Sequence, residues 1–149
     1  MEKETIKNVL LNGQVRLEGQ FVYGSNYTFM VVCQFQDGSF KAVYKPLQGE
    51  RSLWDFPDQT LTKREAAAYL VCEALEWQFV PLTVFRTEGL PMGPGSLQIY
   101  VEHNPDDHYF NQADVYRQFL PKVTAFDLLI NNADRKGGIY SLTLKANYG

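Results

Sequence analysis

The chain has 149 residues, of which 45% are hydrophobic and 21% charged, so it can bury a core and is not disordered. Its net charge of −3 argues against a protein that binds nucleic acid through the phosphates. No run approaches the ~18 apolar residues of a membrane span, and residues 1–13 lack the apolar segment of a signal peptide. We therefore expect a soluble, cytoplasmic protein. Cys33 and Cys72 lie in apolar runs without metal-binding spacing, which favours buried free thiols.

The first part of the chain is predicted to form an antiparallel meander. Partial alternation and β-branched or aromatic residues indicate strands over 14–23, 27–35 and 39–45. The turn-forming segment 24–26 separates the first two strands, and Asp37-Gly38 is a hairpin signal between the second and third.

A helix is predicted over 61–77, where three consecutive alanines have high helix propensity. Thr62 and Glu65 have the spacing of a capping box at its start. Its buried face is expected to consist of four apolar residues at helical spacing: Leu70, Val71, Ala74 and Trp77.

Two further strands are predicted over 82–86 and 96–102, around a turn rich in Gly and Pro. A polar loop over 103–111 leads to a helix over 113–130, which is interrupted or restarts at Pro121. The element order is three strands, a helix, two strands, a polar linker, a helix and an Asp-bearing loop. That order predicts an α+β fold.

Lys45 is the first candidate for chemistry, because it ends the third strand in the run A-V-Y-K, close to the V-A-I-K pattern. In phosphoryl transfer, a lysine holds the ATP phosphates and a carboxylate on a helix positions that lysine. Glu65, near the start of the next helix, is the favoured partner, and Glu73 is its rival. The structural alternative is a surface lysine at a strand end, with Glu65 acting only in the capping box.

Two polar segments could complete a phosphotransfer site. Gly24-Ser25-Asn26 lies where a phosphate-covering loop belongs, and its small residues would let backbone N–H groups approach phosphate oxygens. Asp134 follows an apolar helix end and lies beside Arg135 and Lys136. Its carboxylate can orient an acceptor hydroxyl, while the basic pair offsets phosphate charge. An ordinary turn is the alternative for both segments.

No metal site is assigned. His103 and His108 share a polar loop with Asp106 and Asp107, a composition that favours a solvated loop over a metal site. The run W-D-F-P at 54–57 precedes the helix, so it is not the metal-binding D-F-G of kinases.

Several stretches resemble a group of bacterial proteins classed with phosphatidylinositol 3- and 4-kinases and distantly similar to HipA-like kinases. The runs LWDFPDQTLTKREAAAYL and INNADRKGG are the specific ones, and other matching pieces extend over most of residues 10–138. The supporting pieces are GSNYTF, AVYKPLQGERS, VPLTVF, GPGSLQIYVEH and HYF.

The resemblance implies a protein-kinase-like fold, with an N-lobe and hinge over 1–102 and only the beginning of the helical C-lobe over 103–138. Lys45 would be the ATP lysine, Glu65 its partner and Asp134 the catalytic-loop aspartate. The implied cofactors are ATP and Mg²⁺, and the phosphate acceptor is not identified. The hinge that meets adenine, mainly through backbone groups, would include Gln98, Tyr100, Val101 and Glu102.

The end of the chain departs from that pattern. The family continues with a histidine at the position of Ile139 and with a later Asp-His-Gly segment, whereas residues 139–149 contain no Asp or Glu. Deleting one base from a possible coding string for GGHLLLDTEGKLWVID yields GGIYSLTLKANYG and a stop codon. We interpret 139–149 as a frameshifted tail. We therefore expect weak ATP binding, negligible transfer and an uncovered apolar face on the helix at 113–130.

Two other functions stay open. One is a non-catalytic nucleotide-binding or interaction module derived from the kinase fold. The other is a plain α+β structural domain in which Lys45 and Asp134 are surface residues.

Overall fold

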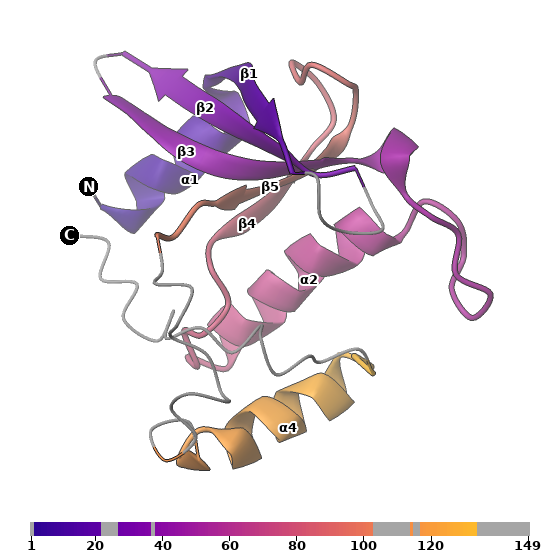
Figure 1. Cartoon of the computed structure of the whole chain (residues 1–149). Coiled ribbons are helices and arrows are strands. Elements are labelled where there is room, and N and C mark those ends of the chain that lie inside the picture. The colour runs from indigo at the N-terminus through magenta and orange to yellow at the C-terminus, as the bar shows by residue number, and fades with distance from the viewer. Residues whose placement is uncertain (1, 22–26, 37, 103–113, 115–116, 134–149) are drawn as a thin grey trace.

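The computed structural model describes residues 2–21, 27–36, 38–102, 114 and 117–133, and it is an α+β fold built on one antiparallel sheet. Figure 1 shows α2 between this sheet and the last helix, α4. The five strands, in their order across the sheet, are β1 (Gln14–Gln20), β2 (Phe29–Phe35), β3 (Gly38–Pro46), β5 (Gly95–Ile99) and β4 (Thr83–Arg86).

The predicted meander is confirmed, with small changes at the strand ends. Phe35 pairs with Gly38, so the β2–β3 connection lies one residue earlier than the Asp37-Gly38 signal indicated. Gln36 in that connection has a φ of 51°, in the left-handed region that tight turns require. The last strand joins the sheet out of sequence order, because β5 pairs with both β3 and β4.

Helix α1 (Lys3–Asn12) was not predicted. Ile6, Val9 and Leu10 are its buried residues, at the i, i+3, i+4 spacing of an amphipathic helix. The helix packs against β2, β4 and β5. The core also takes residues from β3 and the second helix. Its buried residues are Ile6, Val9, Leu10, Phe29, Val31, Cys33, Ala42, Tyr44, Tyr69, Leu82, Val84 and Leu97.

Helix α2 (Leu61–Ala74) is present and ends three residues earlier than predicted. Of its predicted buried face, Val71 and Trp77 are half-buried, but the other two residues are not buried. Leu70 is 61% exposed, and Ala74 is also exposed. The helix instead turns small or aromatic residues inward, because it lies close to β4 and β5. Those buried residues are Thr62, Ala66, Tyr69 and Cys72. Cys33 and Cys72 are buried free thiols, as predicted.

The predicted capping box is also wrong. The backbone N–H of Thr62 and its hydroxyl both donate to Glu50 Oε1, at 2.6 and 2.7 Å. Glu50 follows the short 3₁₀ turn η1 (Leu47–Gly49), which itself follows β3. The first turn of the helix is therefore capped by the Glu50 carboxylate, which lies outside the helix. Glu65 does not take part in capping and is available for another contact.

Helix α4 (Leu120–Leu129) begins at a restart, since Gln118 and Phe119 form a turn before it. Its inward residue Phe126 packs edge-on against Phe79, with ring centroids 4.9 Å apart. Leu128 and Leu129 are 79% and 61% exposed, so the expected uncovered apolar face is present on this helix. Among the described residues, none of the helices is both long and apolar enough to cross a membrane.

Candidate functional site

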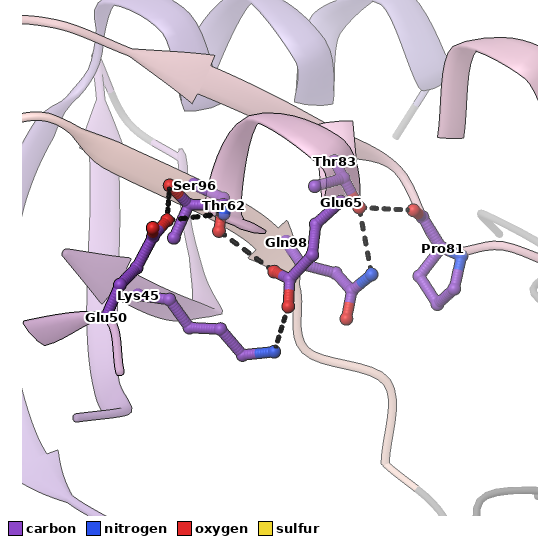
Figure 2. Close-up of polar contacts among 8 residues, drawn as sticks. All are labelled: Lys45, Glu50, Thr62, Glu65, Pro81, Thr83, Ser96 and Gln98. Atoms are coloured by element: carbon purple, nitrogen blue, oxygen red, sulfur yellow. Dashed lines mark hydrogen bonds and ion pairs between the residues drawn. The ribbon is translucent and has the colours of Figure 1, made fainter. Parts of the chain in front are cut away.

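Lys45 and Glu65 are joined by an ion pair, with 2.5 Å between Lys45 Nζ and Glu65 Oε1. Lys45 lies near the end of β3, and Glu65 lies in the first turns of α2 (Figure 2). Their side chains are 33% and 38% exposed, so solvent reaches both partners. The ion pair therefore links the third strand to the helix that follows it, where a solute could approach the ammonium.

The second carboxylate oxygen of Glu65 is held by the sheet. The hydroxyl of Ser96 donates to Glu65 Oε2 at 3.1 Å. Ser96 lies directly opposite Lys45 in the β3–β5 ladder and is 1% exposed. The preceding residue, Gly95, allows the strands to approach closely, since a Cβ atom there would lie 2.8 Å from the ring of Tyr44.

The residues of the predicted hinge lie within β5 (Gly95–Ile99) and directly after it. Gln98 lies inside β5, and its Nε2 donates to Thr83 Oγ1 on β4 at 2.9 Å. The backbone N–H of Tyr100 donates to the carbonyl oxygen of Lys41 at 2.9 Å. Val101 is half-buried and Glu102 is exposed. The predicted contact of residues 98–102 with adenine stays a prediction, and the Tyr100 N–H already has a partner in Lys41.

Other lysine–glutamate pairs show that an ion pair alone does not define a site. Glu73, the rival partner on α2, pairs with Lys3 of α1. Burial lowers the pKa of the Lys3 ammonium, but the Glu73 carboxylate and Tyr69 outweigh it and the pKa is raised. Lys41, on the same strand as Lys45, pairs with Glu18 at 3.2 Å. The distinguishing feature of the Lys45 pair is its connection to Ser96.

The remaining predicted site residues lie outside the described residues. They are Gly24, Ser25 and Asn26 of the loop between β1 and β2, and Asp134, Arg135 and Lys136 after α4. The predicted convergence of Lys45 and Asp134 thus stays a prediction. The loop with His103 and His108 and the tail 139–149 lie outside the described residues too. The part that is described holds no group of three or more His, Cys, Asp or Glu side chains arranged for a metal ion.

Sequence reasoning missed Ser96 and Glu50. The alternation of polar Ser96 and Gln98 with apolar neighbours marks a polar face of β5, but the register that sets Ser96 opposite Lys45 is visible only in the sheet. Glu50 carried no signal, because its partner Thr62 is twelve residues away across an irregular loop.

A shallow groove lies elsewhere, between the end of α1 and the end of β4. The Arg86 guanidinium in it donates to the backbone carbonyls of Gly13 and Glu88, both at 2.7 Å, so its charge serves the fold. None of the predicted site residues lines this groove, which is formed by Leu11, Asn12, Arg86, Thr87, Glu88 and Gly89.

Comparison with known proteins gives one informative likeness. No family model matches the chain, and no solved structure matches it. The chain is similar to Protein Rv2133c of Mycobacterium tuberculosis (strain ATCC 25618 / H37Rv), with 37% identity over an alignment of 167 positions. The match covers 87% of this chain and 59% of that protein, so the chain spans less than two thirds of the relative's length. The relative's name states no activity, substrate or partner.

Proposed function

We propose that this chain is the nucleotide-binding part of an ATP-dependent phosphotransferase, of the phosphatidylinositol 3-/4-kinase-like or HipA-like kind. The observation that carries the proposal is the 2.5 Å ion pair between Lys45 and Glu65. In protein kinases, the phosphate-binding lysine lies on the third strand and pairs with a glutamate of the next helix, and that pair must be in place for transfer. The finer fold proposed is accordingly a kinase-like N-lobe.

The chemistry of the pair supports phosphate binding. An ammonium group has three N–H donors. In the described contacts, Lys45 uses one of them for Glu65, so its other donors can bind phosphate oxygens. Glu65 holds the ammonium at the end of β3, and both side chains are partly exposed. The ammonium is therefore open to a phosphate group that approaches from solvent.

The other roles in this proposal rest on the resemblance. ATP would supply the transferred phosphoryl group. Gly24-Ser25-Asn26 would cover its phosphates, and residues 98–102 would meet adenine. Asp134 would orient the acceptor hydroxyl, with Arg135 and Lys136 offsetting phosphate charge. The described residues suggest no ligand set for Mg²⁺ and no chemical class of acceptor.

Nucleotide-induced stabilisation tests the proposal. A ligand that binds only the folded state stabilises it by about 2.7 kcal/mol when its concentration is 100 times Kd. We expect Mg·ATP to raise the Tm of the wild-type chain and Lys45→Ala to abolish the rise. Lys41→Ala is the matched control, because Lys41 lies on the same strand and has its own ion pair with Glu18. An unchanged wild-type Tm in millimolar Mg·ATP, or an equal loss in the Lys41 variant, would contradict the proposal.

Transfer is tested separately from binding, in a chain extended to the length of the relative. Kinase activity predicts that Asp134→Ala abolishes phosphoryl transfer while nucleotide binding persists. Binding without transfer in the extended wild-type chain would instead favour a non-catalytic nucleotide-binding module.

A further inference from the structure

Glu65 is held at both carboxylate oxygens by different elements of the fold (Figure 2). Oε1 contacts the Lys45 ammonium on β3, and Oε2 accepts the Ser96 hydroxyl from β5. Long side chains such as Lys and Glu lose rotamer freedom when they are fixed in one geometry, which opposes the formation of exposed ion pairs. A second contact on the carboxylate reduces that cost by fixing Glu65 before the lysine pairs with it.

We propose that Ser96 is a positioning residue, which orients the Glu65 carboxylate so that Lys45 is held ready for phosphate. The binding of phosphate by Lys45 rests on the function proposed above, whereas the contact between Ser96 and Glu65 does not depend on it. Ser96 acts through Glu65 and is not itself placed in contact with nucleotide.

The sheet makes Ser96 a rigid support. It pairs with Lys45 on one side and with Phe85 on the other, so β5 is fixed along both edges. The residue is 1% exposed, and a hydroxyl this deeply buried is costly unless it finds a partner. Glu65 Oε2 supplies that partner, and a hydrogen bond to a charged acceptor is stronger than one between neutral groups.

The other ion pairs are built differently. Lys41 pairs with Glu18, and Lys3 pairs with Glu73 while its ammonium also lies over the ring of Tyr69, which belongs to the same helix as Glu73. Lys45 therefore differs from the other paired lysines through a buried residue on an adjacent strand. The difference is expected of a lysine that must keep one position while a ligand exchanges.

The first test needs no nucleotide. Acetylation of lysine amines by acetic anhydride, followed by mass spectrometry, measures how often each ammonium leaves its partner. We expect Ser96→Ala to raise the rate at Lys45 severalfold relative to Lys41, and Ser96→Thr, which keeps the hydroxyl, to restore protection. Thr83→Val is the matched control, because Thr83 is a buried hydroxyl on β4 that contacts Gln98 and Pro81 instead of Glu65.

The second test measures Mg·ATP affinity in the same variants. Losing one hydrogen bond to a charged group predicts about tenfold weaker binding in Ser96→Ala. In a Glu65→Gln background, Ser96→Ala should add little, because the two residues act as one unit.

The outcomes separate the two proposals. If Lys45 becomes reactive in Ser96→Ala but the wild type binds no nucleotide, the proposed function fails and the positioning role stands. If the wild type binds nucleotide while Ser96→Ala changes neither reactivity nor affinity, the positioning role is wrong. Equal changes in Thr83→Val would also overturn it, because they would reflect general loosening of the sheet.

Discussion

The two halves of α2 each carry a glutamate paired with a lysine, and the two pairs differ in what surrounds them. Glu65, near the start of the helix, meets Lys45 from β3 and Ser96 from β5. Glu73, two turns later, meets Lys3 from α1. Side-chain exposure is similar, at 38% for Glu65 and 30% for Glu73, so burial does not separate them.

The comparison shows that the residues around an ion pair indicate its role better than the presence of the pair itself. The Lys3 pair ties one helix to another, and such exposed pairs contribute about 0–1 kcal/mol to stability. The Lys45 pair is built into the junction of two strands and a helix, where its position is fixed by the ladder. Under the function proposed above, the Lys45 pair would bind nucleotide and the Lys3 pair would serve only the fold. Four experiments test this distinction and the fold around the two pairs.

The largest effect is expected where α1 is anchored. Leu10 is fully buried in the core, and Leu→Ala substitutions at such sites cost about 2–5 kcal/mol. Leu10→Ala should lower the free energy of unfolding by that amount in urea titration, whereas Leu11→Ala should cost far less because Leu11 is 37% exposed. Equal costs would mean that α1 is held by its ion pair and not by its apolar face.

The second effect concerns nucleotide affinity. Glu65→Gln removes the charge that positions Lys45 and should weaken Mg·ATP binding by about tenfold or more, as expected for a lost contact to a charged group. Glu73→Gln, the matched change on the same helix, should alter affinity by less than about twofold, since non-contacting surface changes cost under about 0.5 kcal/mol. Isothermal calorimetry measures both. Similar losses in the two variants would remove the distinction between the pairs.

The pH range over which the pairs can be compared is limited by Cys33. Burial raises the pKa of its thiol from 9.0 to about 11, partly offset by the nearby Arg86 charge. Between these values the unfolded chain loses the proton while the folded chain keeps it, so stability falls as pH rises, by about 1.4 kcal/mol per unit. Cys33→Ala should flatten the decline in the unfolding free energy between pH 9 and 10.

The flattening should be partial. The pKa values of Tyr44, raised by burial, and of Lys3 are also above their ordinary values, so both add to the alkaline loss. An unchanged slope in Cys33→Ala would mean that its thiol already ionises in the folded protein near its ordinary value.

The smallest effect is expected at the start of α2. Glu50→Ala removes the acceptor for the backbone N–H of Thr62 and should cost about 1 kcal/mol, as other lost helix caps do. Glu50→Gln keeps an acceptor oxygen and should cost less. Glu50 Oε2 is buried without a hydrogen-bond partner among the described residues, so the neutral amide also avoids the cost of burying an incompletely hydrogen-bonded charge. Thermal unfolding of both variants measures the difference.

The sheet was predictable because strand alternation and turn residues are local signals. The β1–β2–β3 meander follows from them, and only the ends moved by a few residues. The face of α2 was not predictable, since apolar periodicity places Leu70 inward only if a surface is there to receive it. Helix α1 also has a local signal, because Ile6, Val9 and Leu10 have the i, i+3, i+4 spacing of an amphipathic helix.

The site was predictable in part. The motif around Lys45 and the position of Glu65 in the next helix identified the two partners that the structure joins. Ser96 and Glu50 act across 31 and 12 residues of sequence, so their roles depend on tertiary placement that no local pattern encodes. The last strand was predicted to extend to residue 102, but β5 ends at Ile99.

The insertion of β5 between β3 and β4 has a consequence for synthesis on the ribosome. The first three strands leave the ribosome in order and can pair as soon as they emerge. One edge of β3 stays unpaired until residues 95–99 have been synthesised. A nascent chain halted before Gly95 exposes that edge, which can recruit strands from other chains. Completion of the sheet and delivery of Ser96 to its place opposite Lys45 are thus a single late event.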